Sequence, residues 1–197
     1  MSEKNNLLNG EPRKPENRRN SNQRNLSQLV LCAVLVGLAA ALGMVKLFHL
    51  PFGGSITLLS MLAATLCGYF CGTVKGLISG LALGLLNFIL GPYIVHPVQV
   101  IMDYFLAYTA LGLSGLTRNK PNGLISGYLI AVAARYFFSF LSGYIFFGAY
   151  APEGWNPLLY SFVYQFFYLG VEAVITVIIL MIPAVKNNLQ KLKSQVR

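Results

Sequence analysis

The sequence predicts an all-α membrane protein whose helices cross the bilayer several times. Of its 197 residues, 55% are hydrophobic and only 11% are charged, whereas soluble domains carry about 25% charged residues. The mean hydropathy is +0.59. Runs of about 20 apolar residues recur along the chain, and a helix of that length crosses a hydrocarbon core of about 30 Å. One membrane domain is therefore expected, over residues 28–185.

Six such runs can be placed on the chain. The expected spans are Leu29–Leu47, Ile56–Cys71, Val74–Gly91, Pro97–Leu116, Gly123–Gly148 and Pro157–Met181. The second run is short, so it is expected to tilt little or to end inside the bundle. The first run is expected to be retained rather than cleaved as a signal peptide, because five more apolar runs follow it.

The distribution of basic residues predicts the orientation. Thirteen of the fifteen Lys and Arg residues lie in the two tails and in the second and fourth loops. Because basic residues near short loops stay on the cytoplasmic side, both termini are expected to be cytoplasmic. Residues 1–27, rich in Asn and Arg, are expected to be a disordered tail, and residues 186–197 a second basic tail. Despite a net charge of +9, no basic stripe on a soluble face points to nucleic acid.

Small residues recur at every fourth position in two spans, which allows a neighbouring helix backbone to approach closely. The two stripes are Gly76, Gly80 and Gly84 in the third span, and Ala33, Gly37 and Ala41 in the first. For the third span, packing within the bundle is the favoured interpretation. For the first, internal packing and docking of another membrane subunit remain equal alternatives.

Three ionisable residues lie at membrane depth: Asp103, Arg135 and Glu172. Each is costly there unless it is paired or faces a cavity. One interpretation is an ion pair between Arg135 and a carboxylate that holds two helices in register. The other places a carboxylate against a cationic ligand, and Asp103 is preferred for this role because it lies near the outer face. Arg135 or Glu172 is then assigned to structure.

Polar and aromatic side chains surround this candidate carboxylate. Gln99 with Asp103, and Tyr104 with Tyr108, are spaced four residues apart and line adjoining helix faces. Aromatic residues are also dense at the outer ends of the last two spans. They are Tyr144, Phe146, Phe147, Tyr150, Trp155, Tyr160, Phe162 and Tyr164. An interfacial belt explains most of them, and a cage for a flat or cationic ring is the alternative.

No enzymatic motif is found. The two histidines, His49 and His96, lie near outer loops without an acid–base partner in sequence range, and neither HExxH, a P-loop nor a nucleophile elbow is present. Cys67 and Cys71 share a helix face, and packing is a more common role for such a pair than metal binding. The chain is therefore expected to be no enzyme and to hold no metal or cofactor.

Five segments carry a resemblance to a known family. They are GGSIT at 53–57, GLISGLALGLLNFILG at 76–91, VQVIMDY at 98–104, ARYFFSFLSGYIFFGAYAPEG at 134–154 and YSFVYQ at 160–165. Together they resemble the thiamine-specific S-components, the ThiT family, of energy-coupling factor (ECF) transporters. The resemblance implies a bacterial plasma-membrane subunit that captures thiamine from outside. It further implies delivery through a transmembrane coupling protein and two ATPases, docked on Ala33, Gly37 and Ala41.

The resemblance also implies the binding residues. The family's acidic residue and Tyr on the fourth span match Asp103 and Tyr104, and its sixth-span Tyr matches Tyr160. Four positions depart from the family pattern: Asp103 replaces the usual Glu and is one methylene shorter, Ser139 replaces His, Phe147 replaces Trp, and Gln165 replaces Asn. The loop at about 48–55 resembles the family's lid over the ligand. Thiamine is the expected ligand, with a related pyrimidine or thiazole compound as the alternative.

A second hypothesis is a stand-alone proton- or ion-coupled carrier in which Asp103 and Glu172 titrate during the cycle. A membrane-embedded enzyme is a third, for which the sequence supplies no catalytic set.

Overall fold

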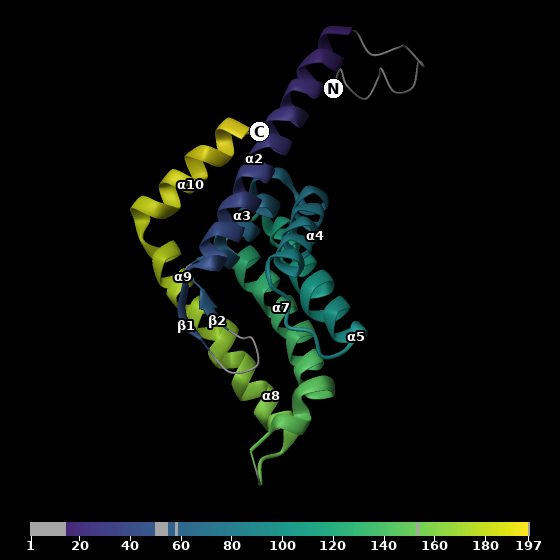
Figure 1. The fold of residues 1–197 in the computed structure, drawn as a ribbon. Helices are drawn as coiled ribbons and strands as arrows, with labels where there is room; N and C mark the ends of the chain where they lie inside the picture. The colour runs from purple at the N-terminus through teal and green to yellow at the C-terminus, as the bar shows by residue number, and fades with distance from the viewer. Residues whose placement is uncertain (1–14, 50–54, 58, 153, 197) are drawn as a thin grey trace, which may run out of the picture.

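The computed structural model describes residues 15–49, 55–57, 59–152 and 154–196, and Figure 1 shows them as a helical bundle. Five segments are long and apolar enough to cross a membrane. They are Ser21–Met44, Thr73–Leu90, Pro97–Thr117, Gly123–Phe147 and Pro157–Met181. Each overlaps a span expected from the sequence, so the polytopic all-helical class is confirmed. The ends of the described chain lie at the same end of the bundle (Figure 1), as an even number of crossings requires.

The second expected span is shorter than the others and lies inside the bundle. Helix α3 (Ser60–Cys71) has twelve residues, and all of them are buried. At 1.5 Å per residue it is about 18 Å long, less than a bilayer core. The expected start at Ile56 is wrong because that residue belongs to a β-strand. Gly72, with φ of 97°, then turns the chain into α4 (Thr73–Leu90).

Two of the long spans are built from several helical segments. The fourth span consists of α5 (Pro97–Val100), the π-helix η2 (Ile101–Leu106), α6 (Ala107–Thr109) and the 3₁₀-helix η3 (Ala110–Thr117). The sixth consists of α8 (Pro157–Gln165), the π-helix η5 (Phe166–Gly170) and α9 (Val171–Met181). Both begin with Pro at the first helical position after a side-chain cap, from His96 and Asn156 respectively. The fifth span is α7 (Gly123–Phe147), extended by the 3₁₀-helix η4 (Gly148–Tyr150).

The glycine stripe of α4 packs within the bundle, as expected. A Cβ placed on Gly80 would meet the backbone of Thr109, and one on Gly84 would meet the carbonyl of Tyr104. The backbone of α4 therefore lies directly against the fourth span. Because Tyr104 belongs to η2, this close approach also positions a segment that carries two candidate binding residues.

Helices extend into both terminal segments. Helix α2 (Pro15–Met44) already begins at Pro15, within the segment expected to be disordered, while residues 1–14 lie outside the described residues. Extending an existing helix adds one hydrogen bond per residue, which favours this continuation. At the other end, α10 (Pro183–Val196) packs back on the bundle. The Lys193 ammonium lies 4.0 Å from the Tyr69 ring centroid.

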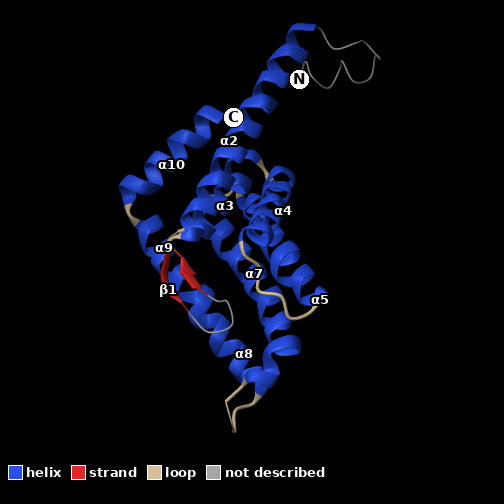
Figure 2. Cartoon of the chain, viewed as in Figure 1, coloured by secondary structure: helices blue, strands red, loops and turns tan. Residues whose placement is uncertain are grey.

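A small antiparallel ribbon interrupts the helical fold between α2 and α3 (Figure 2). Strand β1 (Lys46–His49) pairs with β2 (Ser55–Thr57), and Lys46 lies opposite Thr57. The first span therefore ends at Met44 rather than at Leu47. Residues 50–54, and with them most of the expected lid, lie outside the described residues.

Candidate functional site

One cavity of ≈ 180 Å³ lies among the fourth, fifth and sixth spans, α4 and the β-ribbon. Polar and aromatic side chains line most of it, which is unusual for the interior of a membrane bundle. Two of the segments that line it, η2 and η5, are π-helices. π-Helical turns commonly occur at functional sites.

All six residues expected to bind substrate line this cavity. Asp103 and Tyr104 come from η2, Ser139 and Phe147 from α7, and Tyr160 and Gln165 from α8. They lie on three different spans, and the tertiary fold brings them together. Their contact with a ligand remains a prediction.

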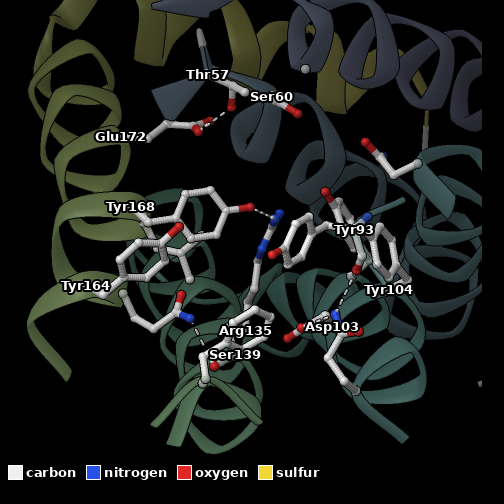
Figure 3. Close-up of a pocket in the computed structure, with 18 of the residues that line it drawn as sticks. Thr57, Ser60, Tyr93, Asp103, Tyr104, Arg135, Ser139, Tyr164, Tyr168 and Glu172 are labelled. Atoms are coloured by element: carbon white, nitrogen blue, oxygen red, sulfur yellow. Dashed lines mark hydrogen bonds between the residues drawn. The ribbon is translucent and has the colours of Figure 1, made fainter. Parts of the chain in front are cut away.

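The Asp103 carboxylate is held by a neighbouring amide (Figure 3). Gln99 Nε2 donates to Asp103 Oδ2 at 2.8 Å and also to the Tyr93 carbonyl at 3.2 Å. Gln99 Oε1 in turn accepts from Val95 N at 3.2 Å. Gln99 is thus fixed by the chain before α5, and it orients the half-buried carboxylate at the cavity wall. The four-residue spacing expected from the sequence produces this contact directly.

Aromatic rings form a wall next to the carboxylate. Tyr93 N donates to Tyr104 OH at 2.8 Å, and the Tyr93 and Phe147 rings stack with centroids 5.9 Å apart. Tyr160 and Tyr164 form a second pair, with centroids 6.0 Å apart. All five rings line the cavity. Their faces carry negative partial charge and attract a cation, so the wall suits a flat, positively charged ring.

The dense aromatic set expected from the sequence divides into two groups. Phe147, Tyr160 and Tyr164 line the cavity, as the cage hypothesis required. The exposed members are Tyr144, Tyr150, Trp155 and Phe162, which fits an interfacial belt. Phe146 belongs to neither group, since it is half-buried and does not line the cavity. Its ring stacks on His96 with centroids 5.0 Å apart.

Gln165 and Ser139 contact each other across the cavity wall. Gln165 Nε2 donates to the Ser139 carbonyl at 3.1 Å. Gln165 Oε1 is buried and has no hydrogen-bond partner among the described residues. An unpaired buried acceptor is costly, so this oxygen is available to a ligand that brings a donor.

Arg135 occupies the middle of the site (Figure 3). Its guanidinium lies 4.1 Å from the Tyr108 ring centroid, and Nη2 donates to Tyr168 OH at 3.3 Å. Arg135 Nε has no hydrogen-bond partner among the described residues. Within the part of the chain that the structure describes, the ion pair between Arg135 and a carboxylate, one of the two alternatives, is not formed. The aromatic ring and the tyrosine hydroxyl take the place of that carboxylate.

Glu172 has a structural role, as one of the alternatives proposed. Its Oε1 accepts from Met61 N at 2.9 Å, and its Oε2 accepts from Thr57 Oγ1 at 2.6 Å. One carboxylate on α9 therefore holds both the start of α3 and the end of β2. Sequence spacing gave no sign of this, because the residues are more than a hundred positions apart.

Several residues of the cavity wall are not predicted from the sequence. Tyr93 lies in the loop before α5, and Lys46 and Thr57 lie on the ribbon. For Tyr93 a signal was present, since this loop was expected on the same outer side as Asp103. No sequence signal marks Lys46 and Thr57 as cavity residues, because both positions are expected at the ends of membrane spans.

The small-residue stripe of the first span faces outward. Ala33, Gly37 and Ala41 are all exposed, and a Cβ placed on Gly37 would have nothing within 4 Å. Packing within the bundle, one of the two alternatives, is therefore excluded for Gly37. The docking of a partner on this stripe remains a prediction.

Several known proteins of one family are similar to this chain. The model of the thiamine transporter protein family (Thia_YuaJ) matches residues 29–192. The chain is 29% identical over 173 residues to the thiamine transporter ThiT of Bacillus subtilis, a match that covers 80% of this chain and 90% of that protein. It is 37% identical over 92 residues to ThiT of Lacticaseibacillus paracasei, covering 40% of this chain and 46% of that protein. The second match thus spans less than half of its relative.

A solved structure agrees with these sequence matches. ThiT from Listeria monocytogenes superposes with a TM-score of 0.67 at 29% identity, covering 81% of this chain and 96% of that chain. The relatives are bacterial and the helices are long enough to cross a bilayer, so this is a multi-pass protein of the bacterial cell membrane. Since the family model matches nearly the whole membrane domain, the chain belongs to the thiamine transporter protein family.

Proposed function

We propose that this protein is the substrate-binding S-component of an ECF-type vitamin importer. It captures thiamine from outside the cell and delivers it through an ATP-driven coupling module. One observation carries the binding part of the proposal: the residues expected from the family resemblance, on three separate spans, all line one cavity.

The chemistry of that cavity suits thiamine. Thiamine joins a cationic thiazolium ring to a neutral aminopyrimidine ring. Asp103 supplies a negative charge and the tyrosine faces attract the thiazolium, while Gln165 Oε1 is free to accept a hydrogen bond from the pyrimidine amine. The protein binds and positions its ligand and is not an enzyme.

The transport part of the proposal rests on the exposed stripe Ala33, Gly37 and Ala41. A flat surface of small residues allows a partner helix to approach closely within the bilayer. The sequence holds no nucleotide-binding P-loop, and in this proposal partner subunits supply the energy for transport. We propose that these are one transmembrane coupling protein and two ATPases.

Calorimetric titration of the detergent-purified protein tests the binding proposal. Thiamine and its separate pyrimidine and thiazole halves are titrated in parallel. Submicromolar binding of thiamine with much weaker binding of each half supports capture of the whole vitamin. Absence of thiamine binding by folded protein, or tighter binding of one half, contradicts it and indicates another ligand.

The charge argument is tested by Asp103→Asn, which keeps the size and the Gln99 contact but removes the charge. Affinity for thiamine is expected to fall at least about tenfold, or about 1.4 kcal/mol. Asp103→Glu is the matched control, because it retains the charge and is expected to bind far better than the Asn variant. Equal affinities of the wild-type and Asn proteins would remove Asp103 from the cation site.

A proton- or ion-coupled carrier is the second candidate. It is favoured by the four ionisable side chains that line the cavity, namely Lys46, Asp103, Arg135 and Glu172. Uptake of labelled thiamine distinguishes the two candidates. The S-component requires a co-expressed coupling module and ATP, whereas a carrier works alone and stops when the proton gradient is dissipated.

A further inference from the structure

The Glu172 carboxylate joins two parts of the chain that border the cavity (Figure 3). It is 3% exposed, and each of its oxygens accepts a hydrogen bond. One bond comes from the Thr57 hydroxyl at the end of β2, and the other from the Met61 amide in the first turn of α3. Glu172 therefore spans the junction between the β-ribbon and the bundle.

The junction itself needs this support. Leu59 adopts φ of 58° and ψ of 18°, a left-handed conformation that is unfavourable for a side chain with a Cβ. Leu59 also precedes α3 without providing a side-chain cap, so the first amides of that helix depend on an outside acceptor. The Glu172 carboxylate is this acceptor for the Met61 amide.

The ribbon borders the cavity through its paired ends. Lys46 and Thr57 lie opposite each other in the β1–β2 register, and both line the cavity. Strand β2 packs against η5 and α9. The Thr57–Glu172 bond is a direct polar link that fixes this end of the ribbon to the sixth span.

We propose that Glu172 is a positioning residue for ligand retention, acting through Thr57. Its bond to Thr57 holds the β-ribbon against the cavity, and loss of that bond lets bound ligand escape faster. In this proposal Glu172 acts on the ribbon through Thr57, and Asp103 remains the cation site. The inference rests on the proposed thiamine binding for its kinetic consequence, but its structural part is independent of any ligand.

The first experiment is therefore made without ligand, by amide hydrogen exchange of the full-length protein in detergent. Thr57→Val removes the hydroxyl but leaves the hydrogen bond from Met61 N to the Glu172 carboxylate in place. Exchange of the β1 and β2 amides is expected to accelerate about tenfold, while the Met61 amide stays protected. Thr176→Val is the matched control: Thr176 is fully buried on α9 and does not line the cavity.

The second experiment measures thiamine dissociation after dilution or competition. Thr57→Val is expected to raise the dissociation rate about tenfold, and Thr57→Ser, which restores the hydroxyl, is expected to return it close to wild type. Glu172→Gln keeps an acceptor for Met61 and an amide donor for Thr57, so its effect is expected to be smaller than that of Glu172→Ala. If Glu172→Ala does not fold, the comparison of Thr57→Val with Thr57→Ser still tests the positioning role.

The outcomes separate the two proposals. If wild-type protein does not bind thiamine, the proposed function fails, while faster ribbon exchange in Thr57→Val still supports the link to Glu172. If wild type binds but Thr57→Val matches Thr176→Val in both exchange and dissociation, the positioning role is overturned. Faster dissociation with unchanged ribbon exchange also overturns it, because Thr57 would then act by touching the ligand.

Discussion

Gly84→Ala is expected to weaken both the fold and the ligand site, because a single methyl group would meet the backbone of η2. A Cβ at this position overlaps the carbonyl oxygen of Tyr104 and lies 3.0 Å from its carbonyl carbon and 3.2 Å from Tyr108 Cβ. Backbone atoms cannot rotate away as a flexible side chain does. Either α4 or η2 must shift, and η2 carries Asp103.

The magnitude follows from two opposing effects. Overpacking of this kind costs about 1–3 kcal/mol, and the clash with backbone places Gly84→Ala at the upper end. Replacing Gly by Ala in a helix returns about 1 kcal/mol. The net loss is therefore about 2 kcal/mol, which lowers Tm by roughly 4–8 °C for a chain of this size. Displacement of Asp103 and Tyr104 is expected to weaken thiamine binding about tenfold or more.

Gly37→Ala is the matched control, since it makes the same substitution in a membrane helix with nothing within 4 Å of the added carbon. It is expected to leave affinity unchanged and to raise Tm slightly. Unfolding can be followed with a thiol-reactive dye, because Cys32, Cys67 and Cys71 are all free and buried. If Gly84→Ala and Gly37→Ala gave the same Tm and affinity, the close packing of α4 on η2 would be refuted.

Three further substitutions test the docking surface, the aromatic wall and the packing of α10. Gly37→Leu is expected to abolish coupled uptake of labelled thiamine while calorimetry shows unchanged binding, and retained uptake would exclude docking on this stripe. Phe147→Trp enlarges the π face beside the cation and is expected to tighten thiamine binding by about 0.5–1 kcal/mol, so an unchanged Kd would place the cation elsewhere. Lys193→Met removes the ammonium from the Tyr69 ring and the Arg118 carbonyl. It is expected to lower Tm by a few degrees without changing the Kd for thiamine, and a higher Kd would show that α10 affects the cavity.

The residues of the cavity wall were predictable from the sequence to the extent that their chemistry was local. Asp103 is a carboxylate within an apolar run, and its four-residue spacing from Gln99 predicted that the two side chains share a helix face, where they form a hydrogen bond. The departures at Ser139, Phe147 and Gln165 were visible only against the family pattern. The outward direction of Gly37 was left open, because a stripe of small residues has the same spacing whether it meets lipid or protein.

By itself, the sequence determined which segments enter the membrane. Transfer of a segment into the bilayer depends on its own length and composition, which are local properties. Those properties predicted four of the five long spans to within one residue at each end, whereas the first span begins well before the expected Leu29. They also marked the second span as short. They also located the three ionisable groups at membrane depth.

Only the tertiary structure decided what those groups do. Arg135 lies over Tyr108 instead of pairing with a carboxylate, and Glu172 bonds to Thr57, which is 115 positions away. The π-helical turns of η2 and η5 and the packing of α10 were likewise absent from any local pattern. Such contacts arise because burial in a packed bundle forces each polar group to find whichever partner the fold brings near, and sequence spacing does not encode that neighbour.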